Sequence, residues 1–162
     1  MQKLDPDKLP DAVKAAHAAA LRWVDKKFEG RRIKPAPVVV AFPTPELGEG
    51  ATLHAILVPP NGTQRERLRP SAMDVRAALT RGTGADVSRT VAANASLVLV
   101  ECCLWVEGMP EDTSKDPRVL ARDYLMTDLK EEAGSLGQAF DLISNACMEL
   151  LNDGPEVRLG KL

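Results

Sequence analysis

The sequence predicts an α+β protein that is mostly helical: an N-terminal helix, a small antiparallel β-hairpin or sheet, and then a bundle of about four helices. Three observations support this prediction. Apolar residues recur at helical spacing near the start of the chain, two short β-rich runs follow, and helical periodicity with capping residues returns after residue 70. At 162 residues the chain is expected to form one globular domain, which we place at residues 38–154.

The first predicted element is a helix within residues 1–30, running from about Asp11 to Glu29. Gly30 follows it and can adopt the left-handed conformation that ends many helices. The apolar stripe of this helix either joins the core of the domain or accepts another protein. Its members, with one tryptophan at the edge, are the candidate protein-binding residues Val13, Ala16, Trp23, Val24 and Phe28.

A basic, proline-rich stretch at residues 31–37 predicts a linker, and residues 38–70 predict a small antiparallel sheet. The runs PVVVAF and ATLHAILV are the first two strands, because β-branched and apolar residues dominate both. Asn61-Gly62 is typical of a tight hairpin turn, since both central positions of that turn need positive φ. The run TQRERLR is therefore expected to return as a charged edge strand.

Residues 71–154 predict the helical bundle. Side chains that can accept hydrogen bonds from the first turn of a helix stand at the expected helix starts. These patterns are Ser71 with Asp74, Asp116 before a proline, and Ser135 with Gln138. Residues 155–162 lie beyond the last apolar stripe and predict a loose tail.

The stretch LVLVECCLW, residues 97–105, allows two interpretations. LVLV alone is typical of a buried strand, whereas the residues before and after it continue one helical stripe. That stripe consists of Val87, Val91, Ala95, Val98 and Cys102. We therefore favour a helix that runs to about Val106.

Composition and charge exclude several classes of protein. A net charge of −2 argues against a general electrostatic attraction to nucleic acid. The N-terminal stretch lacks the apolar region of a signal peptide, and no apolar run is long enough to cross a bilayer. We expect no membrane association and a cytoplasmic location.

The cysteines Cys102, Cys103 and Cys147 do not have the spacing of metal ligands, and the histidines His17 and His54 lie far from them in the sequence. Reduced, buried thiols are the expected state, and a vicinal disulfide or a thiol sensor is the alternative. No metal and no cofactor is expected.

No motif assigns a catalytic residue. The loop RGTGAD, residues 81–86, precedes a helix but matches no phosphate-binding motif, so a helix–helix connection is the simpler interpretation. Carboxylates are numerous, yet none has a recognisable spacing to a base or a nucleophile. The sequence therefore favours binding over catalysis.

The order of elements over residues 50–153 resembles the tail assembly chaperones and related small tail proteins of tailed bacteriophages. Those proteins share a hairpin, an R-P-[ST]-x-x-[DE] helix start, an aliphatic helix with a cysteine, and a final helix pair with a glycine-containing joint. The matching positions here are Arg69, Pro70, Ser71 and Asp74, then Leu97, Val98 and Cys102, and finally Gly134, Ser135 and Gly137. The long N-terminal helix and the two prolines at positions 43–45 depart from that pattern.

The resemblance implies a non-enzymatic protein that holds tail components, such as the tape-measure protein, until the tail assembles. A permanent structural or adaptor subunit of a virion or contractile tail is the first alternative, and a small-molecule-binding protein or enzyme is the second. The expected partners are tail components or other subunits, including further copies of this chain. The location that the resemblance implies is the cytoplasm of the host cell, or the virion.

Overall fold

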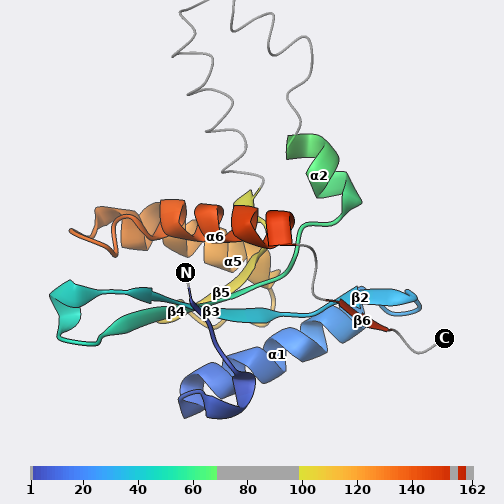
Figure 1. Ribbon diagram of the computed structural model, residues 1–162, viewed down its shortest axis with the longest axis horizontal. Coiled ribbons are helices and arrows are strands. Elements are labelled where there is room, and N and C mark those ends of the chain that lie inside the picture. Colours follow the sequence, from blue (N-terminus) through green and yellow to red (C-terminus); the bar gives the residue numbers. More distant parts are fainter. Residues whose placement is uncertain (1, 69–98, 154–156, 160–162) are drawn as a thin grey trace, which may run out of the picture.

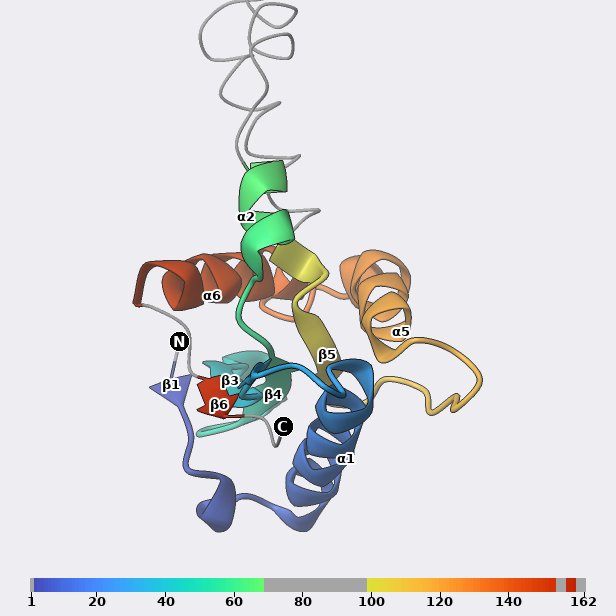
Figure 2. The same cartoon turned by 90° about the vertical axis from the view of Figure 1, so that its right-hand side faces the viewer.

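In the computed structural model, a four-stranded antiparallel sheet lies between one helix on one face and two helices on the other (Figures 1 and 2). The structure describes residues 2–68, 99–153 and 157–159. The sheet has the strand order β1-β3-β4-β5, and a separate two-stranded ribbon pairs β2 with β6. The strands are β1 (Gln2–Lys3), β2 (Ile33–Pro35), β3 (Val38–Pro43), β4 (Thr52–Leu57), β5 (Cys103–Val106) and β6 (Val157–Leu159).

Helix α1 covers one face of the sheet, and α5 and α6 cover the other (Figure 2). The described α-helices are α1 (Asp11–Lys27), α2 (Gly62–Leu68), α5 (Pro117–Asp123) and α6 (Ala139–Asp153). Short 3₁₀ turns occupy Pro6–Lys8, Pro45–Leu47 and Leu129–Glu131, and a π-helical turn at Tyr124–Asp128 continues α5.

The hairpin β3–β4 is apolar on both faces because both faces are covered. Its two strands pair in register from Val38 opposite Leu57 to Pro43 opposite Thr52. Alternate residues point to opposite faces of a strand. Val40 therefore packs in the cluster with α5 and α6, whereas Val39 packs against α1. This double burial explains why PVVVAF is a continuous apolar run instead of an alternating one.

A β-bulge interrupts the pairing of β4 with β5. Ile56 lies opposite Trp105 and Leu57 lies opposite Cys103, so Leu104 is the extra residue. An extra residue shifts the alternation of side chains by one position. As a result, Leu104 and Trp105 both pack on the α1 side of the sheet, although they are neighbours in sequence.

The predicted hairpin turn at Asn61-Gly62 is wrong: these residues begin helix α2. Asn61 Oδ1 accepts a hydrogen bond from the Gln64 backbone N–H at 2.9 Å, and Gln64 Oε1 accepts one from the Asn61 N–H at 3.0 Å. These reciprocal bonds form a capping box, and they satisfy backbone donors that a helix start leaves unpaired. The glutamine three residues after Asn61 therefore outweighs the turn preference of Asn-Gly, and the expected edge strand is absent from residues 62–68.

Replacing Asn61 by alanine is expected to destabilise the protein by about 1 kcal/mol, because α2 loses the side-chain oxygen that caps its first turn. Thermal unfolding followed by circular dichroism measures this loss. Thr63→Ala is the matched control, since Thr63 is exposed and neighbours the cap. Equal melting temperatures for the two variants would contradict the capping box.

The predicted four-helix bundle is also wrong for the described part of the chain. Cys103–Val106 is strand β5 at an edge of the sheet, and α5 and α6 lie on a face of that sheet. The bulge is the physical reason, because two adjacent residues that point the same way disguise the alternation expected of a strand. The helix starts predicted at Ser71 and residues 81–86 lie outside the described residues.

The capping box predicted for Ser135 and Gln138 is wrong, because the Ser135 hydroxyl donates to Glu46 and α6 begins at Ala139. Two other predictions agree with the structure. The N-terminal helix is α1, and Gly30 after it has a φ of 77°. Asp116 caps α5 by accepting a hydrogen bond from the Arg118 backbone N–H at 2.9 Å. By contrast, the expected linker and the expected tail each contain a strand, since Ile33 in β2 pairs with Leu159 in β6.

Candidate functional site

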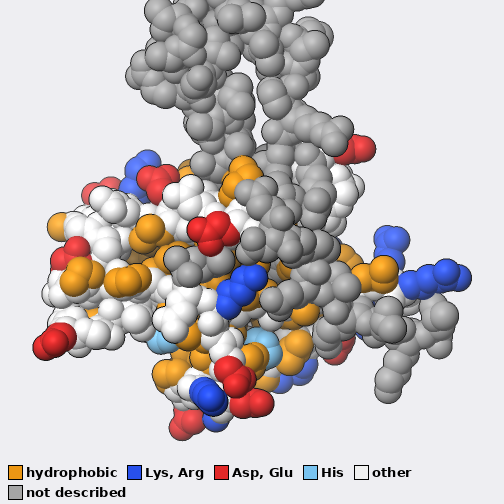
Figure 3. Space-filling model, in the orientation of Figure 1, with side chains coloured by type: hydrophobic (Ala, Val, Ile, Leu, Met, Phe, Trp, Pro, Cys, Tyr) orange, Lys and Arg blue, Asp and Glu red, His pale blue; other side chains and the backbone are white. Residues whose placement is uncertain are grey.

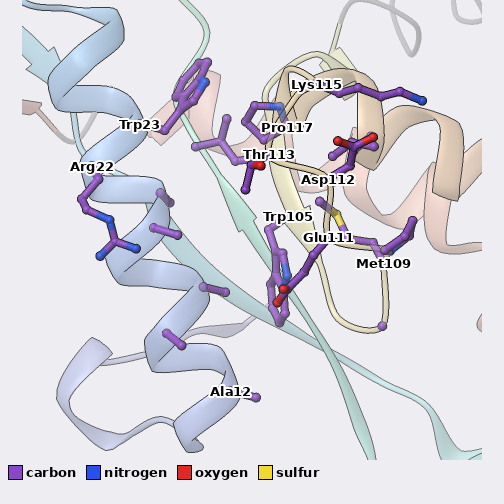
Figure 4. Close-up of a pocket in the computed structure, with 18 residues that line it drawn as sticks. Ala12, Arg22, Trp23, Trp105, Met109, Glu111, Asp112, Thr113, Lys115 and Pro117 are labelled. Atoms are coloured by element: carbon purple, nitrogen blue, oxygen red, sulfur yellow. The ribbon is translucent and has the colours of Figure 1, made fainter.

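A groove of about 760 Å³ lies between α1 and the loop that joins β5 to α5 (Figure 4). Leu104 and Trp105 of β5 line it together with loop residues 108–113. The opposite wall is one side of α1, and it consists mainly of alanine. These wall residues are Ala12, Ala15, Ala16, Ala19 and Ala20, with Arg22 and Trp23 at the end of the row.

Two features of the sequence create this groove. Alanine side chains are short, so five of them on one side of α1 leave space that larger side chains would fill. The bulge at Leu104 adds the second feature, because it turns Trp105 to the α1 side of the sheet. Figure 4 shows Trp105 between α1 and the loop, beside Glu111. The groove is therefore mostly apolar, with charged side chains at its margins.

Two carboxylates in and beside the loop, Asp112 and Asp116, have structural partners. Asp112 Oδ1 accepts hydrogen bonds from the Ser114 N–H at 3.0 Å and from its hydroxyl at 2.6 Å, and these bonds lower the pKa of Asp112. Asp116 accepts hydrogen bonds from the Arg118 guanidinium at 3.2 and 2.9 Å, which lower the pKa of Asp116. Both groups are therefore ionised at neutral pH, and they order the loop and the start of α5.

A second hollow of about 390 Å³ lies on the other side of Trp23, which lines both spaces. Trp23 and Phe28 meet edge to face, with their ring centroids 6.4 Å apart. The Arg118 guanidinium carbon lies 5.1 Å from the centre of the Trp23 ring, a cation–π contact. The buried Pro59 and Pro60 complete an apolar cup. The two hollows thus form neighbouring sites along α1.

The pair His54 and Glu107 is the described arrangement that most resembles catalytic machinery. His54 Nδ1 and Glu107 Oε2 lie 2.6 Å apart, as a histidine and its orienting carboxylate do in a nucleophilic site. Neither residue lines either hollow, however. The backbones of the two residues are also hydrogen-bonded, since the Glu107 N–H donates to the His54 carbonyl at 2.9 Å. The pair therefore joins β4 to the residue after β5.

The three cysteines are reduced and buried, as the sequence predicts. Burial raises the pKa of Cys103 to about 12, and a hydrogen bond with Cys102 raises the pKa of Cys147. No group of three or more His, Cys, Asp or Glu side chains within residues 2–68, 99–153 and 157–159 could hold a metal ion. The thiols therefore act as small apolar side chains in the core.

All three thiols are expected to react with a disulfide reagent such as DTNB about 100-fold or more slowly in the native protein than in urea, because the reactive species is an exposed thiolate. Stopped-flow absorbance measures both rates. Native-state labelling as fast as labelling in urea would show that the thiols are accessible.

The predicted protein-binding residues divide into two groups. Val13 and Val24 are 1% and 0% exposed and pack against the sheet, so they belong to the core. Ala16 and Trp23 line the groove, and Phe28 lines the second hollow. The sequence did not reveal Trp105 as a site residue, since LVLVECCLW was interpreted as a helix.

Fold and site together define a three-layer α+β protein with an apolar groove along its N-terminal helix and with no recognisable catalytic centre among the described residues. Neither a family model, nor a curated protein, nor a solved structure matches this chain. None of the described helices has the length and apolar character needed to cross a membrane.

Proposed function

We propose that this chain is a non-enzymatic protein-binding factor that holds an apolar helical segment of a partner in the groove between α1 and loop 108–113. The groove itself carries the proposal. Its alanine wall lets another backbone approach closely, and Trp23 and Trp105 offer large apolar surfaces of the kind that dominate binding energy at interfaces.

The assembly of a phage tail, or of a related particle, is the setting that we propose for this binding. Support comes from the sequence motifs that resemble those of tail assembly chaperones. The element order no longer supports the resemblance, because Gly62 begins helix α2 instead of a hairpin and Cys103–Val106 is strand β5. Cys102, Gly134, Ser135 and Gly137 of the matching positions lie in the described residues, and the others lie outside them. The helical bundle no longer supports the resemblance, because the described C-terminal half packs on a sheet. A permanent tail subunit is the alternative setting.

The test is to block the groove and measure capture of a candidate tape-measure protein from the same genome. Ala15 is exposed and lines the groove, so Ala15→Trp is expected to abolish co-purification. Lys14→Trp is the matched control, because Lys14 is exposed on the same helix outside the groove lining. Equal capture by both variants would contradict binding in the groove. Finding the chain in purified particles would favour the permanent subunit.

A further inference from the structure

The end of the molecule beside the second hollow is strongly basic. Residues 22–34 contain six Lys and Arg against two Asp and Glu, in a chain whose net charge is −2. Five of these basic residues are exposed: Arg22, Lys26, Lys27, Arg31 and Arg32. Figure 3 shows Lys and Arg side chains projecting at the end where α1 leads into β2. The positive charge is therefore concentrated where α1 ends.

The cations that line or border the second hollow are already paired. Arg118 pairs with Asp116 at 2.9 Å, and Arg67 pairs with Glu101 at 2.7 Å. Within the described ranges, in contrast, Lys26, Arg31 and Arg32 form no ion pair. These three side chains can therefore meet carboxylates from another molecule.

The second hollow suits one bulky apolar side chain. The rings of Trp23 and Phe28 line it at a large angle to each other, and Val58 and Pro59 add further apolar lining. Its volume of about 390 Å³ exceeds that of a single side chain, which leaves room for the backbone that carries it. Trp23 lines both this hollow and the groove, so a segment that lies along the groove can extend to the hollow.

Building on the proposed function, we propose that the partner segment is an acidic amphipathic helix. Its apolar face lies along the alanine wall, one bulky apolar side chain enters the second hollow, and its carboxylates face Lys26, Arg31 and Arg32. Helix α1 has 17 residues and is therefore about 25 Å long, so the matching segment has about four to five turns. Opposite charge at one end also fixes the direction in which the segment lies.

Two synthetic peptides test this inference directly. Both are helices of about 18 residues with the same leucine face, and their polar positions are all Glu in one peptide and all Lys in the other. Fluorescence anisotropy of the labelled peptides is expected to show the acidic peptide binding at least about tenfold more tightly. Raising the salt concentration from roughly 50 to 300 mM is expected to weaken that binding.

Charge-reversal variants test whether the affinity for the acidic peptide depends on the basic residues at the end of α1. The double variant Arg31→Glu with Arg32→Glu is expected to lose about tenfold or more in affinity for the acidic peptide. The matched control, Lys8→Glu with Lys14→Glu, changes the same charge at exposed positions near the other end of α1 and is expected to lose much less. Both tryptophans of the chain, Trp23 and Trp105, line the groove, so the tryptophan emission of the unaltered protein is expected to shift when the acidic peptide binds.

The two proposals fail in different ways. Equal binding of both peptides, together with loss of binding in Ala15→Trp, would overturn the acidic partner and leave the groove as a binding site. Failure of both peptides to bind would also overturn the inference, and so would self-association of the chain through this face. If Ala15→Trp in addition captures the tape-measure candidate normally, the proposed function fails as well.

Discussion

Deleting residues 1–30 is expected to destroy the cooperative fold of the remaining chain. The deletion removes Val13, Ala20 and Val24 and uncovers Val39, Ile56 and Leu104, which α1 covers. Burial of one large apolar side chain contributes about 1.5–3 kcal/mol, and a whole domain is stable by only about 5–15 kcal/mol. Urea unfolding followed by circular dichroism is expected to show no cooperative transition.

A single substitution tests the same face without shortening the chain. Val24 is 0% exposed, so Val24→Asp places an unpaired charge in the core and is expected to cost more than about 4 kcal/mol. Lys14→Asp makes a charged substitution at an exposed position of the same helix and is expected to have a small effect. If the shortened chain unfolds cooperatively and Val24→Asp is tolerated, α1 is a detachable arm instead of a core helix.

Replacing Gly134 by alanine is expected to have the second largest effect. Gly134 has a φ of 69°, a conformation that costs other residues about 1–2 kcal/mol. An added Cβ would also collide with the carboxylate of Glu46. That carboxylate accepts hydrogen bonds from the Ser135 N–H at 3.0 Å and from the Ser135 hydroxyl at 2.6 Å. The free energy of unfolding should therefore fall by more than the backbone cost alone.

Gly50→Ala separates the backbone cost of a positive φ from the cost of the collision with Glu46. Gly50 has a φ of 73° with open space at the Cβ position, so this variant carries only the backbone cost. In a Glu46→Ala background, Gly134→Ala should cost the same as Gly50→Ala.

The hydrogen bond from the Ser135 hydroxyl lowers the pKa of Glu46. The contribution of this bond to the stability of the fold is therefore present at neutral pH, and it is lost as the pH falls below 4.5, the ordinary pKa of a glutamate. Equal effects of Gly134→Ala and Gly50→Ala at neutral pH would exclude a role for Glu46.

Local signals in the sequence were sufficient for α1, β3 and β4, but not for the short strands β1 and β2. The stripe containing Val13 and Val24 predicted α1, and the β-branched run at Val38 predicted β3. This apolar stripe could not show which of its residues are buried in the core and which line the groove, however. Val24 and Trp23 are adjacent, and only the position of the sheet decides that Val24 is buried and that Trp23 borders the groove.

The errors at β5 and at Trp105 came from features that depend on distant parts of the chain. β5 is a strand because β4 pairs with it, and the bulge at Leu104 removes the alternation that would have revealed it. The error at Asn61-Gly62 was of another kind, since the deciding residue, Gln64, was visible in the sequence. Trp105 was missed as a site residue because its direction depends on the same bulge.

The hydrogen bond between the Val58 N–H and the Cys102 carbonyl, 2.8 Å long, has a consequence for how the chain folds. It joins two residues that lie far apart in the sequence, so forming it closes a long loop of the chain. Closing such a loop depends only weakly on its length, and each doubling costs about 0.6 kcal/mol. The hairpin β3–β4 forms through local contacts, whereas β5 can pair with β4 only after this loop has closed. β5 is therefore expected to join the sheet late in folding. A longer chain segment between Val58 and Cys102 would slow this step while leaving the final stability almost unchanged.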